Sequence, residues 1–394
     1  MKMFLLGSFV GVGFLACSLT AAQIGPRFYG DPPDDHHPWA VHDGNRPQPV
    51  RVTPGTFSSQ ERAGQPPSDA IVLFDGKDLS NWETSKGEPA KWLVKDGYME
   101  VAKDAGEIRT KARFGDCQLH IEWAPPGKVE GEGQDHGNNG VFLMGMLEIQ
   151  VLDSYDNVTY ADGHAGSYYG VNPPLALPLR PPGEFQVYDI VFRRPIYKDG
   201  QPIDPGYVTV FLNGVLVQDH TPIEGPGGHM GRSRPRPFPA QGPLSLQDHG
   251  NPTRFRNIWY RELPPRSAEG GTDGWLATEA AMAKRKEIAA SIRQDAERLV
   301  SSDNPLPGLL RMMESLAYDK DQGAAQRSER LANQYVESLR QVPAEQLAAK
   351  RNEVRNLAEV FKYLTRHGIL PATFGPKTAI DQMIKDQGWD RRRP

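Results

Sequence analysis

The sequence predicts a mainly β protein in two parts, a β-sandwich of the jelly-roll type followed by a small bundle of α-helices. Between residues 70 and 263, short runs that alternate apolar and polar residues are separated by Gly- and Pro-rich turns. After Pro265, a small, polar, Gly-rich stretch gives way to apolar residues at helical spacing. The 394 residues give room for two such domains, and 35 Pro with 40 Gly fit a loop-rich β part.

The N-terminus has the features of a secretion signal. Lys2 precedes an apolar stretch that is too short to span a bilayer, and small residues suited to cleavage end at Ala22. We therefore expect residues 1–22 to be removed and the mature protein, periplasmic or secreted, to keep no transmembrane helix. Lipidation at Cys17 is the alternative, which we favour less because Phe14 stands where a lipobox has Leu.

Residues 23–69 are predicted to form a Pro-rich, irregular and poorly packed leader, because they have little periodic apolar content. Its three histidines could suggest a metal site, but we favour a solvated segment because no scaffold surrounds them. The formal net charge of −4 gives no reason to expect nucleic acid as a partner. If Cys17 leaves with the signal, Cys117 is the only cysteine, and we expect it to be buried on a strand.

The strands of residues 70–263 are predicted from alternation. Residues 119–123 and 147–151 place apolar side chains on one face and polar side chains on the other. Residues 207–218 contain Asn213-Gly214 between two β runs, a strong signal for a hairpin with a type I′ turn.

Residues 264–274 are predicted to be a linker and residues 275–394 a helical domain. Three apolar stripes at helical spacing indicate an antiparallel bundle. They comprise Ile288, Ile292 and Leu299; Leu331, Tyr335 and Leu339; and Val354, Leu357, Phe361 and Leu364. His367-Gly368 is expected to end the last of these helices.

Polar side chains share one face on each of three predicted strands. If these faces belong to one sheet, that sheet presents groups suited to proton transfer and to hydrogen bonds with sugar hydroxyls. The alternative is an ordinary solvated face of an antiparallel sandwich. The residues concerned are His120, Glu122, Glu148, Gln150, Ser245, Gln247 and His249.

Five segments of the β part occur in the order found in a known family, the 3-keto-disaccharide hydrolase-like family, which the chain resembles over about residues 70–263. These segments are residues 73–82, 137–143, 147–154, 246–250 and 255–258. Members are described as 3-keto-glucoside 1,2-lyases or 3-keto-2-hydroxy-glucal hydratases. The resemblance implies a concanavalin-like jelly roll whose concave sheet carries the ligand. His136 departs from the family pattern, which has Arg at this position.

The resemblance implies cleavage of 3-keto-glycosides, for which the site needs a base, an acid and a group that polarises the ketone. We expect His249 and Glu148 to transfer protons and Tyr169 to serve as a possible donor to the leaving group. The residues expected to bind substrate are His120, Glu122, Gln150, Asn138, Gln247, Asp248 and His136.

Two other functions remain open. A paired-carboxylate glycoside hydrolase would use Glu122 and Glu148 at a separation of about 5–9 Å. A non-catalytic carbohydrate-binding module would line its site with aromatic residues and use the helical domain for protein contacts. No cofactor is indicated with certainty, although the polar loop after Asp153 leaves a divalent cation open.

Overall fold

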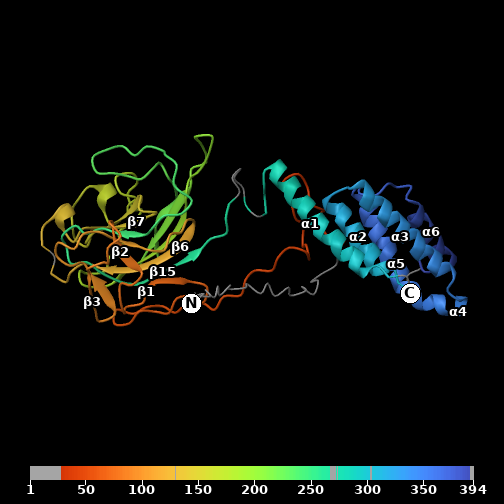
Figure 1. The fold of residues 1–394 in the computed structure, drawn as a ribbon, viewed down its shortest axis with the longest axis horizontal. Coiled ribbons are helices and arrows are strands. Elements are labelled where there is room, and N and C mark those ends of the chain that lie inside the picture. The colour runs from red at the N-terminus through yellow and green to blue at the C-terminus, as the bar shows by residue number, and fades with distance from the viewer. Residues whose placement is uncertain (1–27, 129, 267–271, 273, 302–303, 391–394) are drawn as a thin grey trace, which may run out of the picture. The chain divides into compact units, whose positions relative to one another are not determined.

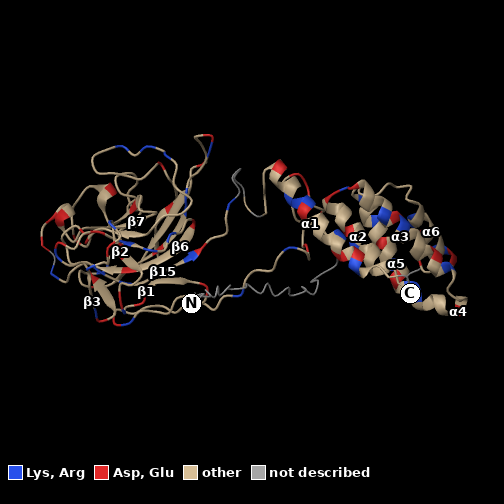
Figure 2. Ribbon diagram, viewed as in Figure 1, with Lys and Arg blue, Asp and Glu red and all other residues tan. Residues whose placement is uncertain are grey.

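The computed structural model describes residues 28–128, 130–266, 272, 274–301 and 304–390. The expected signal sequence, Cys17 and the basic C-terminal run therefore lie outside the described residues. The chain divides into two compact units, one formed by residues 49–273 and the other by residues 1–48 with 274–394 (Figure 1). Charged residues of both signs are scattered over each unit (Figure 2).

The first unit is built on two antiparallel sheets. The larger has eight strands in the order β13-β12-β9-β6-β15-β4-β3, with β1 paired to β15, and the smaller has five in the order β2-β5-β14-β7-β8. The strands of the larger sheet are β1 (Ile71–Phe74), β3 (Leu93–Lys95), β4 (Tyr98–Glu100), β6 (Cys117–Ala124), β9 (Gln186–Arg193), β12 (Tyr207–Leu212), β13 (Val215–Pro222) and β15 (Arg254–Glu262).

The smaller sheet is accompanied by a separate hairpin and two short 3-10 helices. Its strands are β2 (Trp82–Thr84), β5 (Ile108–Thr110), β7 (Asn139–Leu143), β8 (Leu147–Val151) and β14 (Ser245–Leu246). The hairpin pairs β10 (Ile196–Lys198) with β11 (Gln201–Asp204), and the 3-10 helices are η1 (Gly133–Asp135) and η2 (Ala161–Gly163).

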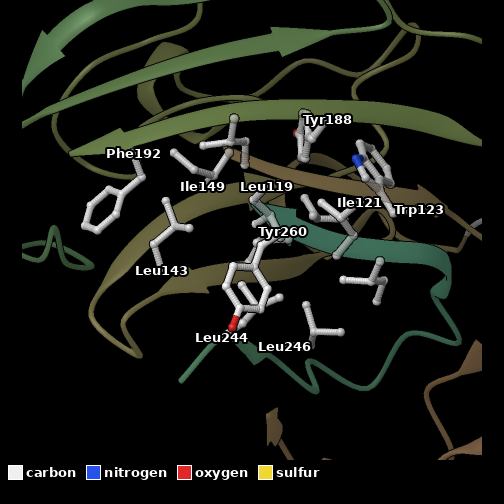
Figure 3. Close-up of a cluster of buried hydrophobic side chains, with 14 of the residues drawn as sticks. Leu119, Ile121, Trp123, Leu143, Ile149, Tyr188, Phe192, Leu244, Leu246 and Tyr260 are labelled. Atoms are coloured by element: carbon white, nitrogen blue, oxygen red, sulfur yellow. The ribbon is translucent and has the colours of Figure 1, made fainter. Parts of the chain in front are cut away.

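The two sheets enclose one apolar core, which confirms the predicted jelly-roll sandwich. Alternate residues of each long strand point into the core, as a period of two requires. Figure 3 shows the core side chains contributed by both sheets, among them Leu119, Ile121, Trp123, Leu143, Ile149, Tyr188, Phe192, Leu244, Leu246 and Tyr260. Cys117 is fully buried and makes no disulfide, as expected.

The predicted hairpin is confirmed and one predicted strand is shorter than expected. Asn213 and Gly214 connect β12 to β13 with φ of 51° and 80°, the left-handed values that a type I′ turn requires. The polar run of residues 245–249 is a strand only at Ser245–Leu246. Gln247 and His249 therefore lie beyond the end of β14 rather than on it.

The leader is irregular, as expected, and many of its described residues are exposed, but specific hydrogen bonds fix parts of it. In the first unit, the Ser58 hydroxyl donates to the Glu122 carboxylate and the Arg256 guanidinium donates to the Gln60 carbonyl. In the second unit, the Asn45 amide donates to the Glu314 carboxylate at 2.7 Å. Hydrogen bonds and isolated apolar contacts, such as those of Phe28 and Trp39, hold this segment, and a periodic hydrophobic pattern reveals neither.

The second unit contains six α-helices among the described residues. They are α1 (Thr278–Leu299), α2 (Leu306–Tyr318), α3 (Gln322–Arg340), α4 (Ala344–Leu347), α5 (Arg351–Arg366) and α6 (Gly375–Asp386), with the 3-10 turn η3 (Ala348–Lys350) before α5. α2 packs against α1 and α3, and α6 packs against α3 and α5.

The predicted stripes on α3 and α5 are buried, and α5 ends directly before His367-Gly368 as expected. On α1, Ile288 and Ile292 are buried but Leu299 is exposed, so the stripe stops one turn earlier than predicted. Within the part of the chain that the structure describes, no helix combines the length and apolar character needed to cross a bilayer.

Candidate functional site

The outer face of the smaller sheet carries the group of polar residues with the most unusual environment. β7 and β8 pair so that Phe142 lies opposite Glu148 and Gly140 lies opposite Gln150. β14 pairs with β7 on its other side and places Ser245 opposite Phe142. The residues between them, such as Val141 and Ile149, point into the core, so this row of side chains faces away from it.

The side chain of Glu148, on β8, extends over the neighbouring strand β7 toward Gly140. A Cβ atom at Gly140 would lie 2.5 Å from Glu148 Oε1 and 2.7 Å from the ring of Phe142. Glycine at position 140 therefore leaves the space in which the carboxylate and the aromatic ring lie together. No hydrogen bond or ion pair reaches the Glu148 carboxylate from the residues that the structure describes.

The environment of Glu148 favours its protonated form. Burial raises the pKa of this carboxyl from 4.5 to about 7, and no cation or donor opposes the effect. A carboxyl that titrates near neutrality beside an aromatic ring can accept or return a proton under ordinary conditions. Such a group is a strong candidate for a catalytic acid or base.

Three amides lie beside Glu148 along β7 and β8. The Gln150 amide donates to Gln134 Oε1 at 2.9 Å, and the Asn138 amide donates to the Gln134 carbonyl at 2.8 Å. The Oε1 atoms of Gln150 and Gln247 are buried and have no hydrogen-bond partner among the described residues. The backbone N–H of Gln247 donates to the carbonyl of Gly140, the residue whose α-carbon lies beside the Glu148 carboxylate. Unpaired amide oxygens of this kind can accept hydrogen bonds from sugar hydroxyls.

Tyr169 adjoins the same site from the loop after η2. Its N–H donates to the Glu148 carbonyl at 3.2 Å, and its hydroxyl lies 2.7 Å from that of Tyr160 and 3.1 Å from Nδ1 of His229. Burial, the Tyr160 hydroxyl and the nearby carboxylates of Glu148 and Asp162 raise the pKa of Tyr169. The structure thus brings Glu148, Tyr169, Gln150, Gln247 and Asn138 to one side of the sandwich.

His249 and Asp248 occupy the turn after β14. Asp248 accepts hydrogen bonds from the N–H groups of Gly106 and Gly250, so it fixes this turn. The His249 side chain is exposed and makes no hydrogen bond to the described residues. The Asn251 amide links this turn to the Asn138 carbonyl at 3.4 Å, which keeps the turn beside the amide cluster.

His136 and Asp153 form a separate pair near the end of β8. His136 Nδ1 lies 3.0 Å from the Asp153 carbonyl and 3.5 Å from Oδ2 of the same residue. Burial raises the pKa of Asp153, and the charge of His136 acts in the opposite direction. Among the described residues, no group of three or more His, Cys, Asp or Glu that could hold a metal is found.

His120 and Glu122 do not share a sheet with Glu148, so the expectation of one common polar face was wrong. Both lie on β6 in the larger sheet and point away from the core on its outer face. Glu122 is fully buried and pairs with Arg256 at 2.7 Å, and His120 Nδ1 lies 2.7 Å from Asp189. Alternation shows which residues of a strand share a face, but it does not show to which sheet the strand belongs.

Several residues of this site had not been singled out from the sequence. Gln134 lies two residues before His136, which had been singled out, and could have been chosen for that position. Phe142 is apolar but faces outward opposite Glu148, and its residue type alone gives no signal for the site. His229 lies 60 residues from Tyr169 in a Gly-rich loop, and no local pattern connects the two.

Comparisons with known proteins find relatives of the β part of the chain. A sequence profile of the 3-keto-alpha-glucoside-1,2-lyase-like domain matches residues 69–261. A solved structure of a candidate glycosyl hydrolase from Parabacteroides distasonis ATCC 8503 is similar, with 47% identity and a TM-score of 0.52, over 55% of this chain and 93% of that chain. A second candidate glycosyl hydrolase from this organism has 24% identity and a TM-score of 0.36, over 49% of this chain and 99% of that chain. None of the curated proteins searched matches this chain.

Proposed function

The chain belongs, through residues 69–261, to the 3-keto-alpha-glucoside-1,2-lyase-like family, and from this premise we propose that it is an exported carbohydrate-active enzyme that cleaves 3-keto-glycosides. The observation that supports the proposal best is Glu148, a carboxyl without a partner whose pKa is raised to about 7 on the outer face of the smaller sheet. Unpaired amide oxygens of Gln150 and Gln247 flank it and suit the hydroxyls of a sugar.

The proposed reaction is an elimination. A ketone at C3 of the sugar acidifies the hydrogen on C2, and Glu148 as the carboxylate removes that proton. The electron pair forms a double bond between C2 and C1, and the glycosidic oxygen leaves C1 with the bonding electrons. The side chain of His249 is exposed beside the amide cluster. We propose that it stabilises the negative charge that develops on the ketone oxygen. Addition of water to the product would complete the net hydrolysis.

The paired-carboxylate mechanism does not fit the structure. Glu122 and Glu148 lie on the outer faces of two different sheets, and the whole core lies between them. Packed sheets are themselves about 10 Å apart, so these carboxyl groups cannot reach the separation of about 5–9 Å that the mechanism needs. A binding module remains as the second candidate, because Phe142 and Tyr169 give the site aromatic surface.

One assay separates these functions. Purified protein is given a 3-keto-glucoside and the matching unoxidised glucoside, and turnover of the keto compound alone is expected, since only the ketone makes the C2 proton removable. Glu148→Gln and His249→Ala are each expected to lower kcat/KM by at least about 10²-fold. Glu88→Gln is the matched control, because it makes the same chemical change at an exposed position, and this variant is expected to retain full activity.

Each alternative outcome of this assay has a definite meaning. Equal turnover of the unoxidised glucoside contradicts the elimination and supports a hydrolase of another mechanism. Binding without turnover of either compound supports the module. A chelator arm tests the cation that Asp153 left open, and loss of activity that added Ca²⁺ or Mg²⁺ restores would show that a metal takes part.

Export is part of the proposal. It is supported by the charge of Lys2 and the short apolar stretch that ends before Ala22. Mass spectrometry of the protein recovered outside the cytoplasm is expected to find a chain that begins near Gln23. An intact Met1 in a cytoplasmic protein would refute export, and a diacylated Cys17 would replace cleavage with lipidation.

A further inference from the structure

A pocket adjoins Tyr169, and Glu148, the proposed base, is not among the residues that line it. This pocket of about 370 Å³ is lined by Tyr160, Asp162, Tyr169, His229 and Arg232, together with Met230 and glycines of the same loops. Its volume is in the range of pockets that hold small organic ligands. It opens next to the residue whose backbone is hydrogen-bonded to that of Glu148.

The loop that carries His229 is fixed against the Tyr169 turn by close backbone packing. The Tyr168 hydroxyl donates to the Gly225 carbonyl, and a Cβ atom at Gly170 would lie 2.5 Å from the Gly228 carbonyl oxygen. Glycine at 170 is therefore required for the two loops to approach. Through this contact His229 reaches the Tyr169 hydroxyl at 3.1 Å although the two residues are far apart in sequence.

The surroundings of Tyr169 suit a proton donor that is refilled by a neighbour. Burial first, then the Tyr160 hydroxyl and the charges of Glu148 and Asp162, raise the pKa of Tyr169 and make its phenolate unfavourable. A tyrosine in such a place gives up its proton only if another group supplies one at the same time. Histidine is the side chain best suited to that supply near neutral pH.

We propose that the pocket beside Tyr169 receives the leaving group of the glycoside, and that Tyr169 protonates the departing oxygen while His229 reprotonates Tyr169. This inference rests on the proposed elimination and adds to it the acid, its proton source and the leaving-group site. Tyr169 is the catalytic acid, and His229 is a positioning residue that acts through it.

The proton and electron balance of the step is complete. Glu148 gains the proton from C2, the C2–H electron pair becomes the C1–C2 double bond, and the C1–O bond breaks with its electrons on oxygen. That oxygen takes the Tyr169 proton, and the Tyr169 oxygen takes the Nδ1 proton of the His229 imidazolium, which becomes neutral imidazole. Exchange with water then removes the proton from Glu148 and returns one to His229.

The transfer of a proton from His229 through Tyr169 to the leaving oxygen, here called the relay, is needed for some leaving groups and not for others. An alcohol or sugar leaves as a strongly basic alkoxide and needs an acid, whereas a nitrophenol leaves as a stabilised anion and does not. The site is therefore matched to 3-keto-glycosides whose leaving group is an aliphatic or sugar alcohol. The hydroxyls of Tyr160 and Tyr169, with Asp162 and Arg232, give such a leaving group both donors and acceptors.

The experiment compares two substrates, methyl 3-keto-glucoside and 4-nitrophenyl 3-keto-glucoside. Tyr169→Phe is expected to lower kcat/KM for the methyl compound by at least about 10²-fold but to change that for the nitrophenyl compound by less than about threefold. His229→Ala and His229→Gln are expected to show the same selectivity, because a glutamine can hold the tyrosine but cannot pass on a proton. Glu148→Gln should lose activity on both substrates.

The matched controls are Tyr155→Phe and His220→Gln, which make the same chemical changes at exposed or partly exposed positions that do not line the pocket. Both are expected to leave the two rates unchanged. Turnover of the nitrophenyl compound shows that a variant is folded, and His229→Gln decides the question if Tyr169→Phe does not fold.

Three results would overturn the relay. Equal losses on both substrates would mean that Tyr169 or His229 acts on the structure of the site. Full recovery of the methyl rate in His229→Gln but not in His229→Ala would reduce His229 to a hydrogen-bond partner. Failure of the unaltered protein to turn over either substrate would refute the elimination itself, and the relay with it.

Discussion

The Glu148 carboxyl lowers the stability of the folded protein rather than raising it. Its carboxyl is largely removed from water beside Phe142 and lacks any partner among the described residues, which makes its ionised form unfavourable. Unpartnered carboxyls with raised pKa values cluster at functional sites, where activity compensates for their cost in stability. This residue therefore offers a test in which stability and activity change in opposite directions.

We predict that Glu148→Gln is more stable than the unaltered protein at pH 8 although it is inactive. The pKa of Glu148 is about 7 in the folded protein and ordinarily 4.5, so folding binds a proton between these values. Stability therefore falls as pH rises from 4.5 to about 7 and stays lower above that, by up to a few kcal/mol. Glutamine carries no such charge, so its advantage should be present at pH 8 and absent at pH 4.

Thermal unfolding at these two pH values measures the effect, with Glu88→Gln as the control that should change neither. A Glu148→Gln protein that is less stable than the parent at both pH values would contradict the assignment of Glu148 as a desolvated, unpartnered acid.

At the residue level, the sequence supports part of the site. Alternation along residues 147–151 correctly gave the outward direction of Glu148 and Gln150, because strand geometry is local. Neither the raised pKa nor the contact with Phe142 could be predicted, since both depend on the register between β7 and β8 and on the space left by Gly140. The approach of His229 depends on loop packing and is equally non-local.

At the level of the elements, β6 shows how a polar face on a strand can serve structure. The outer face of β6 is covered by the segment that contains Ser58, whose hydroxyl bonds to Glu122, and Arg256 donates to the other carboxylate oxygen. Burial would raise the pKa of Glu122, but hydrogen bonds from His120, Ser58 and Asn257 and the charge of Arg256 lower it to about 2. The residues that looked suited to sugar binding are thus engaged within the fold.

We predict that Glu122→Gln destabilises the sandwich by about 3–5 kcal/mol near pH 6, because it leaves the buried Arg256 charge without its partner. The contribution of Glu122 is present above pH 4.5 and is lost as pH falls toward about 2. His120 has a pKa raised to about 9 by Asp189 and Glu122 against the effect of burial, so its contribution is present below 6.5 and is lost as pH rises toward 9.

Urea unfolding at pH 6 and pH 3 measures this prediction, and the difference between Glu122→Gln and the parent should shrink at the lower pH. The control is Gln118→Ala, on the same face of β6, because it neither adds nor removes a charge. An equal difference at both pH values would show that the ionised carboxylate is not the source.

The sequence predicted the elements better than their assembly. The long strands, the Asn213-Gly214 turn and the stripes on α3 and α5 followed from local periodicity and turn chemistry. The membership of β6 and β8 in different sheets could not follow, because strand pairing joins segments that are distant in sequence. The predicted strand at residues 245–249 was too long for a related reason, since Asp248 forms a turn that ends β14 after Leu246.

At the level of the whole molecule, the change of composition after Pro265 indicated a helical part, but not that an N-terminal segment belongs to it. Asp43 and Asn45 are hydrogen-bonded to Tyr318 and Glu314, which lie more than 260 residues later. The segment has no periodic pattern to announce this contact. Residues 49–266 are thus flanked on both sides by parts of the same helical unit.

We predict that limited proteolysis cuts the stretch between Pro265 and Trp275, and that the two fragments remain together under native conditions. The hydrogen bonds of Asn45 and Asp43 to α2 should hold the N-terminal fragment on the helical one. Native size-exclusion chromatography should show one species, and denaturing gel electrophoresis should show two. Asn45→Ala is expected to weaken the association, and fragments that separate without denaturant would contradict the prediction.

The contact between Asn45 and Glu314 also sets an order of events for a growing chain. The segment around Asn45 is synthesised long before α2 exists, so the helical unit can close only after most of the chain has been made. The sandwich is a separate compact unit, so we expect that it can fold in the meantime. A nascent chain that stops early would hold a finished sandwich and an N-terminal arm with no helices to receive it, a state that proteases can recognise.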